Sequence, residues 1–305
     1  MFSRLRRIVL LCILLFGTAN AGGIDRYEKA CSGGDSAACA FAGVFYYTGH
    51  GVKENSLKAK SYFEKACSNT VVDGCFGLGL IYYKGRGVKR DYAKAQGYFS
   101  RACNKSYSDG CYRLGVMFAR GKGVRQDWSK AWGYFRRACS DGDEESCVNL
   151  GLLYARGKGV KRDWTMARKY FARACDEGSA KGCSNYGLIY AKGKGVRQDW
   201  KRAKSLFLKA CSGDDPRGCS NLGLIYSEAR VGERDYGLAR KYFDKACRAE
   251  DATGCSNLAY MYISEQGVAR DYAKARLFFE KACHYGDRES CANYQLLDAN
   301  VQHKK

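Results

Sequence analysis

Residues 139–174 read CSDGDEESCVNLGLLYARGKGVKRDWTMARKYFARA, and this pattern recurs along the chain every 36 residues. Sixteen of the 17 cysteines fall into eight C-x7-C pairs that keep this spacing without a slip. A fixed period of this length is typical of a solenoid built from stacked supersecondary units. Cysteines at regular paired spacing indicate a disulfide framework that forms in an oxidising compartment. The repeat therefore predicts both an architecture and a redox environment.

We predict that each cysteine bonds to its partner eight residues away, because only that pairing suits every unit identically. The first members are Cys31, Cys67, Cys103, Cys139, Cys175, Cys211, Cys247 and Cys283. Their partners are Cys39, Cys75, Cys111, Cys147, Cys183, Cys219, Cys255 and Cys291. Each bridge would staple two adjacent helices, and closing so short a loop stabilises the fold by about 2.5 kcal/mol in the chain-entropy model.

Each unit contains two amphipathic helical patterns. Apolar residues at i, i+3, i+4 and i+7 run from Cys147 to Tyr154 and again from Ala167 to Ala174. An aspartate such as Asp163 stands before the second pattern, where its carboxylate can cap free backbone N–H groups. A Gly-x-Gly-Val connection separates the two patterns and can end the first helix with a positive φ. A glycine inside the first helix, such as Gly151, indicates close approach of another helix.

We therefore predict an all-α, right-handed α/α solenoid. Residues 22–30 would form a capping half-helix, residues 31–282 seven repeats of 36 residues, and residues 283–305 a C-terminal half-repeat cap and tail. Incomplete units at both ends are what a solenoid needs to close its exposed apolar faces.

Residues 1–21 have the pattern of a secretory signal peptide. Arg4, Arg6 and Arg7 precede an apolar stretch that contains Cys12, and Ala19-Asn20-Ala21 forms an A-x-A cleavage site. The apolar stretch is too short to span a bilayer. We expect a secreted protein, extracellular or periplasmic, that begins after Ala21 and has no transmembrane segment.

The chain is strongly basic, with 52 Lys and Arg against 31 Asp and Glu and a formal charge of +21. This charge favours anionic surfaces such as cell-wall polymers or host glycans. It can equally serve solubility alone. Nucleic acid is not an expected partner of an exported chain.

The string L-G-x-x-Y-x-x-G-x-G-V-x-x-D, followed by A-x-x-Y-F-x-x-A, resembles the Sel1-like repeat, a relative of the tetratricopeptide (TPR) repeat. The added C-x7-C pairs make the chain similar to the Helicobacter cysteine-rich protein family. That resemblance implies a secreted protein that binds penicillin and interacts with the host immune system. It also implies a weak hydrolase activity, that of a β-lactamase acting on penicillin and cephalosporin derivatives. A link to antibiotic resistance would follow from that activity.

The residues themselves show no β-lactamase site. The serine motifs S-x-x-K, S-D-N and K-T-G are all missing from the sequence. His50, His284 and His303 are scattered over distant units, and C-x7-C is wider than the usual gap between zinc ligands. The catalytic residues stay unknown, no metal or cofactor is expected, and β-lactam hydrolysis rests on the resemblance alone.

A polar stripe is the candidate ligand site. Asparagines recur two residues after the second cysteine, with basic residues seven positions further on or in their place. The stripe comprises Asn149, Asn185, Asn221, Asn257 and Asn293 with Lys84, Arg113, Arg120, Arg156 and Lys192. In the related TPR fold, first-helix residues line a concave groove that binds peptides. An asparagine amide can both donate and accept a hydrogen bond.

The stripe therefore predicts binding of an extended peptide, a cell-wall muropeptide or a β-lactam. The alternative is that these asparagines tie neighbouring helices together. At the level of function, the alternative to a ligand-binding protein is a non-enzymatic interaction scaffold or a host-directed immunomodulatory factor that acts on host proteins.

Overall fold

The computed structural model describes residues 22–69 and 71–302, and throughout these residues the regular structure is helical. The first helices of the repeats are α3 (Ser36–Thr48), α5 (Val72–Lys84), α7 (Ser108–Arg120), α9 (Glu144–Arg156), α11 (Ala180–Lys192), α13 (Pro216–Ser227) and α15 (Ala252–Ser264). The second helices are α4 (Ser56–Ser68), α6 (Tyr92–Asn104), α8 (Trp128–Ser140), α10 (Trp164–Asp176), α12 (Trp200–Ser212), α14 (Tyr236–Arg248) and α16 (Tyr272–His284). The predicted signal peptide, Cys12 included, lies outside the described residues.

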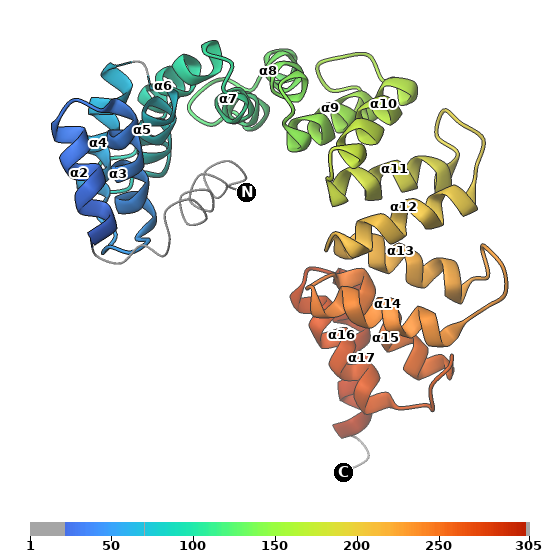
Figure 1. The fold of residues 1–305 in the computed structure, drawn as a ribbon. Helices are drawn as coiled ribbons and strands as arrows, with labels where there is room; N and C mark the ends of the chain where they lie inside the picture. The colour runs from blue at the N-terminus through green and yellow to red at the C-terminus, as the bar shows by residue number, and fades with distance from the viewer. Residues whose placement is uncertain (1–21, 70, 303–305) are drawn as a thin grey trace. The chain divides into compact units, whose positions relative to one another are not determined.

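Within residues 22–69 and 71–302, one further helix lies beyond the paired helices on each side, α2 (Gly22–Ser32) and α17 (Arg288–Gln302). The chain divides into two compact units. Unit 1 contains the described residues up to Ser146 and the loop Gly157–Lys161, and unit 2 contains Cys147–Arg156 and the residues from Arg162 onward. Within each unit a second helix packs both on its own first helix and on the next one (Figure 1).

First helices of neighbouring repeats also contact each other directly, as α3 does with α5 and α13 does with α11 and α15. In unit 2 the longer loops, which join the two helices of a repeat, lie along one edge of the stack (Figure 1). Equivalent residues of successive first helices therefore come to lie beside one another on one surface of a unit.

Side-chain caps begin most of these helices, as the aspartates predicted. Asp91, Asp127 and Asp271 each accept a hydrogen bond from the backbone N–H three residues later, at 2.8–2.9 Å. The structure adds caps on first helices that the sequence analysis missed, among them Asp35 on α3 and Asp251 on α15. Each cap satisfies backbone donors that the first turn leaves without an intrahelical partner.

The glycines of the connections have the predicted backbone conformation. Gly85, Gly121 and Gly193 follow their first helices with φ between 61° and 70°, a left-handed conformation that glycine adopts without strain. Their N–H groups return to carbonyl oxygens of the last helical turn. The chain can therefore reverse direction and start the second helix within a few residues.

In six of the seven first helices an internal glycine lies against a phenylalanine ring, and in α15 the equivalent residue is Ala259. A Cβ atom at Gly115 would lie 2.6 Å from the Phe135 ring, and one at Gly187 would lie 2.6 Å from the Phe207 ring. Phe207 is fully buried. The predicted close approach is confirmed, and the ring that fills the space belongs to the second helix of the same repeat.

The two residues of each tyrosine–phenylalanine pair differ in burial. Both residues of such a pair fall on the apolar stripe that helical spacing predicts, as within residues 167–174, and Phe99 and Phe135 are indeed buried. Their neighbours Tyr98 and Tyr134 are only half-buried at the surface of the core. Successive residues of a helix point about 100° apart, so both rings of a pair cannot face the same core.

Local disulfides join each repeat to the next. Cysteines eight residues apart are bridged with Cα–Cα distances of 4.5–4.7 Å, as at Cys31–Cys39 and Cys211–Cys219. Cys139 and Cys147 are disulfide-bonded as well. The Cys67–Cys75 bridge, for example, connects the end of α4 to α5. Beside it a Cβ atom at Gly74 would lie 2.6 Å from that of Ala66, so small residues permit this approach.

We predict opposite effects of two glycine-to-alanine changes in one repeat. Gly115→Ala should lower the free energy of unfolding by about 1–3 kcal/mol, because the added methyl group overlaps the Phe135 ring. Gly133→Ala on α8 is the control, since nothing lies within 4 Å of its added methyl group. The control should stabilise by up to about 1 kcal/mol through helix propensity. Urea denaturation measures both, and equal stabilisation by the two changes would contradict the packing.

A second prediction concerns Asp143, which accepts a hydrogen bond of 2.7 Å from the Ser146 N–H. Burial raises the pKa of Asp143 from 3.8 to about 6, against the effect of that hydrogen bond and with help from Asp109 and Glu144. The folded protein then binds the proton more tightly than the unfolded chain. The resulting stability is fully present below the unfolded pKa and is lost as the pH rises through 6.

Between pH 7 and pH 4 the wild type should therefore gain about 2 kcal/mol relative to Asp143→Asn. Urea denaturation over this pH range measures the difference. Asp251→Asn, at the same cap position of another repeat, controls for the change of cap residue. An identical pH profile for wild type and Asp143→Asn would rule out the raised pKa.

Candidate functional site

Three asparagines form a row on consecutive first helices of unit 2. In the asparagine row, defined as Asn185, Asn221 and Asn257, each side chain donates from Nδ2 to the carbonyl oxygen four residues earlier, at 2.7–2.9 Å. That bond holds the side chain along the helix surface. Within the described parts of the chain the Oδ1 atoms have no hydrogen-bond partner. The row therefore presents acceptors whose orientation is already fixed.

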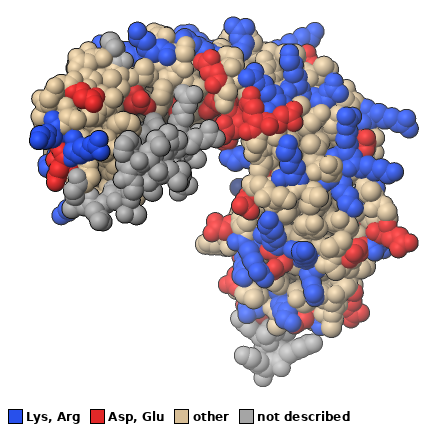
Figure 2. Space-filling view, viewed as in Figure 1, with Lys and Arg blue, Asp and Glu red and all other residues tan. Residues whose placement is uncertain are grey.

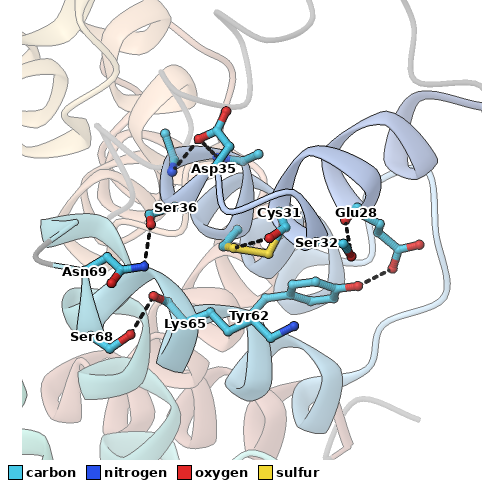
Figure 3. The surroundings of a disulfide bond; sticks show 12 residues. Glu28, Cys31, Ser32, Asp35, Ser36, Tyr62, Lys65, Ser68 and Asn69 are labelled. Carbon is cyan, nitrogen blue, oxygen red and sulfur yellow. Dashed lines mark hydrogen bonds between the residues drawn. A yellow bond between two sulfur atoms is a disulfide. The ribbon is translucent and has the colours of Figure 1, made fainter.

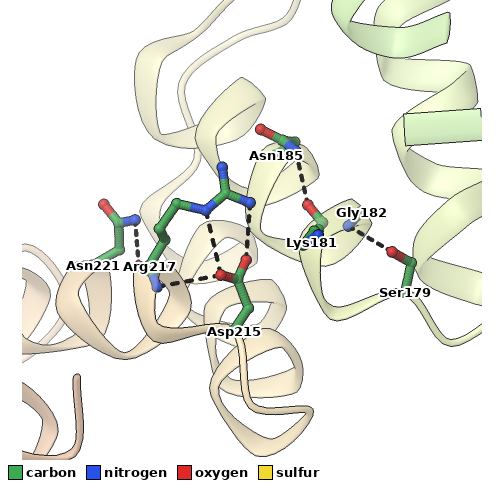
Figure 4. Close-up of polar contacts among 7 residues, drawn as sticks. All are labelled: Ser179, Lys181, Gly182, Asn185, Asp215, Arg217 and Asn221. Carbon is green, nitrogen blue, oxygen red and sulfur yellow. Dashed lines mark hydrogen bonds and ion pairs between the residues drawn. The ribbon is translucent and has the colours of Figure 1, made fainter. Parts of the chain in front are cut away.

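Exposure differs along the asparagine row. Asn185 is 9 % exposed, whereas Asn221 and Asn257 are half-buried. Figure 4 shows Asn185 and Asn221 on neighbouring helices, each reaching back toward its own helix. Leu188, Leu224 and Tyr260 stand three residues further along the same helices. Apolar surface thus lies next to the acceptors.

The outer members of the predicted stripe differ from the row. Asn293 donates to the hydroxyl of Tyr260 at 2.9 Å, and this hydroxyl donates to Glu289 at 3.0 Å. Asn293 therefore ties α17 to α15, which is the packing role that the sequence left open. Asn149 also lies in unit 2, on α9.

The basic members of the stripe are divided between the units. Arg156 and Lys192 end α9 and α11 in unit 2, with exposed side chains. Lys84, Arg113 and Arg120 lie in unit 1, where no asparagine stands at the equivalent positions. Each unit thus carries its own part of the predicted stripe, and among these residues only those of unit 2 combine asparagines with cations.

Charge in unit 1 gathers around a buried phenol. The Arg86 guanidinium lies 4.9 Å and the Lys84 Nζ 6.0 Å from the centre of the Tyr47 ring. Burial lowers the pKa of Lys84, and the neighbouring charges of Arg86 and Arg113 lower it further. This cluster replaces the asparagine pattern in that part of the chain.

An ion pair lies one helical turn before Asn221, the middle member of the asparagine row. Arg217, one turn before Asn221, contacts Asp215 with Nη2–Oδ2 at 3.0 Å (Figure 4). Asp215 is 6 % exposed and caps α13. Lys181 occupies the position of Arg217 in the previous repeat and is exposed. Cations therefore flank the row at the start of both helices, and Lys and Arg side chains are scattered over the visible face of unit 2 (Figure 2).

A second repeated surface, which the sequence analysis missed, consists of aromatic rungs. In a rung, an aromatic ring of the first helix stacks on one of the second helix, with centroids 5.6–5.8 Å apart. The rungs are Tyr46–Tyr62, Tyr82–Tyr98, Phe118–Tyr134, Tyr154–Tyr170, Tyr226–Tyr242 and Tyr262–Phe278.

A cation covers many of the rungs. Lys58, Lys94, Lys130 and Lys274 lie 4.9–5.4 Å from a ring of their own rung. Each stands three residues after a capping Asn or Asp, so a basic residue recurring at that position was the signal in the sequence. Cation–π contacts of this kind contribute about 0.5–1 kcal/mol at exposed sites. A pocket of about 300 Å³ opens at the rung Tyr82–Tyr98, beside Lys94 and Arg101.

The first rung is closed by helix α2. Glu28 accepts hydrogen bonds from Tyr46 at 2.8 Å and from Tyr62 at 2.7 Å. The hydrogen bond from Tyr62 lowers the pKa of Glu28, while burial and Glu28 raise the pKa of Tyr62 to about 12. In Figure 3 the Tyr62 hydroxyl points at the Glu28 carboxylate, close to the Cys31 bridge. Helix α2 thus covers the first rung through Glu28.

The fifth repeat departs from the pattern. Leu206 occupies the position of the second aromatic residue, so Tyr190 has no stacking partner there. The Arg202 guanidinium covers the Tyr190 ring at 4.9 Å, and the Tyr190 hydroxyl lies 3.3 Å from that of Tyr186.

The described residues contain neither a metal-binding cluster nor a membrane-spanning helix. Among residues 22–69 and 71–302, no three or more His, Cys, Asp or Glu side chains are arranged to hold a metal ion. No helix in that same part of the chain is long and apolar enough to cross a membrane.

Comparison with known proteins identifies the repeat. The Sel1 repeat model matches residues 36–70, 72–107, 108–143, 144–179, 180–215, 216–251 and 252–287. Each match begins at the first residue of a first helix. Because each disulfide joins a second helix to the following first helix, it links one repeat to the next. A search of curated proteins found no match.

Two solved structures share the fold, and a third is similar in sequence over part of the chain. A Sel1 repeat protein from Oxalobacter formigenes is 26 % identical, with a TM-score of 0.73 over 91 % of this chain and 80 % of that one. A protective antigen of uropathogenic Escherichia coli is 26 % identical, with a TM-score of 0.53 over 85 % of this chain and 63 % of that one. Helicobacter pylori cysteine-rich protein B is 34 % identical over 43 % of this chain and 95 % of its own, with a TM-score of 0.36. With seven consecutive matches to its repeat, the chain belongs to the Sel1 repeat family.

Proposed function

We propose that this chain is an extracytoplasmic interaction protein whose asparagine row binds an extended peptide segment of a partner protein. The observation that supports this proposal is the set of fixed, unpaired Oδ1 acceptors at Asn185, Asn221 and Asn257. An extended peptide presents backbone N–H groups at regular intervals, and acceptors on successive repeats can pair with them. The disulfides indicate an oxidising compartment outside the cytoplasm.

The surroundings of the row suit a peptide better than a small molecule. Leu188 and Leu224 are half-buried and Tyr260 is 38 % exposed, so they offer shallow apolar contacts beside the acceptors. Lys181, Arg217 and Lys192 add positive charge at the ends of two helices. Binding of this kind combines main-chain hydrogen bonds for affinity with side-chain contacts for specificity.

The test begins with twelve-residue peptides selected by phage display against the wild-type protein, roughly the length that three repeats can contact. The affinity of a selected, fluorescein-labelled peptide is then measured by anisotropy. Asn185→Ala with Asn221→Ala should weaken binding about tenfold, since each lost hydrogen bond costs about 0.5–1.5 kcal/mol. Helicity by circular dichroism should stay unchanged.

Asn293→Ala is the matched control, because its amide bonds to Tyr260 inside the protein. The control should keep the wild-type affinity and melt at a lower temperature. If the double variant instead melts lower and binds as the wild type does, the row is a packing feature. A soluble muropeptide that displaces the selected peptide would place a cell-wall ligand on the same row.

A further inference from the structure

Unit 2 contains a pocket of about 680 Å³ at the start of α12. Tyr190 of α11, Trp200 of α12 and Val196 line it on one side. Arg230, Val231 and Gly232, from the loop of the following repeat, line it on the other. This volume lies in the range of pockets that hold small ligands or a few side chains.

The pocket exists where the repeat sequence breaks. In other repeats the second glycine of the Gly-x-Gly-Val connection lies against the first residue of the preceding second helix. A Cβ atom at Gly195 would lie 2.7 Å from Cβ of Trp164, so only glycine fits there. The equivalent position against Trp200 holds Val231, and the glycine has moved to position 232.

The exchange removes the close glycine contact with the first residue of the helix. Valine is too large for the contact that Gly195 makes, and Gly232 has nothing within 4 Å of where its Cβ atom would be. Leu206, the residue that interrupts the aromatic rung, belongs to the same repeat as Trp200. Tyr190, which lacks a stacking partner because of Leu206, lines the same pocket as Val231, so both departures affect this pocket.

The lining is cationic and largely uncompensated. Arg168, Arg197 and Lys201 form no ion pair within residues 22–69 and 71–302. Arg202 lies 4.9 Å from the Tyr190 ring, and Arg230 lies 5.1 Å from the Trp200 ring while pairing with Glu228 at 2.7 Å. The one acidic residue of the lining, Asp199, caps α12 through the Arg202 N–H at 2.9 Å.

We propose that this pocket binds an acidic peptide segment of a partner protein. Guanidinium groups at Arg168, Arg197 and Arg202 can pair with carboxylates in bidentate geometry. Val196 and Val231 supply apolar surface for a neighbouring aliphatic side chain. An anionic polysaccharide fits less well, because sugar stacking needs an open aromatic face and Arg230 covers that of Trp200. The pocket shares no residue with the asparagine row and does not depend on it.

The first test removes charge from the pocket. The probe is a fluorescein-labelled peptide rich in glutamate and leucine, and its glutamine counterpart is the control peptide. Arg197→Gln with Lys201→Gln should weaken binding of the glutamate peptide by about tenfold in fluorescence anisotropy. Both side chains are exposed, so the fold should tolerate the change.

Arg240→Gln with Lys241→Gln on α14 removes the same charge from exposed positions outside the pocket. This control should retain the wild-type affinity. An equal loss in the two double variants would overturn the proposal, because binding would then follow net charge alone.

The second test closes the pocket without changing charge. Val231→Gly with Gly232→Val restores the glycine–valine order of the other repeats, so the loop should settle on Trp200 and peptide affinity should fall by a similar factor. Unchanged affinity in a variant with wild-type helicity would overturn the proposal. So would displacement of the peptide by a heparin oligosaccharide that binds more tightly and depends on the same two residues. Asn185→Ala with Asn221→Ala should leave binding of the glutamate peptide intact. The proposal for the pocket and the proposal for the asparagine row can therefore fail independently.

Discussion

Close contact between helix backbones is the constraint on which the rest of this structure depends. Gly115 and its equivalents let a phenylalanine ring of the second helix lie against the first helix. Beside most of the disulfides a glycine faces an alanine, as at Gly74 and Ala66. Since only small residues leave room for these contacts, the rotation of each helix about its axis is fixed. Outward-facing positions therefore recur in register, and this register produces the asparagine row and the aromatic rungs.

The sequence predicted the features that local backbone geometry decides. Helix caps such as Asp127, the left-handed glycines and the cysteine pairing follow from spacing alone, and all are present. Features that depend on a neighbouring repeat could not be read in the same way. Asn293 looks like the other asparagines in sequence but bonds to Tyr260 of the adjacent repeat. Tyr98 looks like core, yet the phenylalanine beside it takes the buried position.

Regular repeats and irregular ones have different consequences for binding. A uniform surface such as the asparagine row offers the same acceptor at each step, which suits a peptide backbone without selecting its sequence. The exchange at Val231 and Gly232 removes one inter-repeat contact and opens a cationic pocket in its place. Binding specificity in such a scaffold would then come from positions where the sequence departs from the repeat pattern. The disulfides and glycine contacts keep the surrounding helices in place.

The central claim is that local bridges and close helix contacts together hold these surfaces ready for binding. Thermal unfolding of the oxidised protein and of the reduced, alkylated protein, followed by circular dichroism, tests it most directly. We predict that reduction lowers the melting temperature by tens of degrees, because several kcal/mol of stabilisation are lost with the bridges. A reduced protein that melts within a few degrees of the oxidised one would show that helix packing alone maintains the fold.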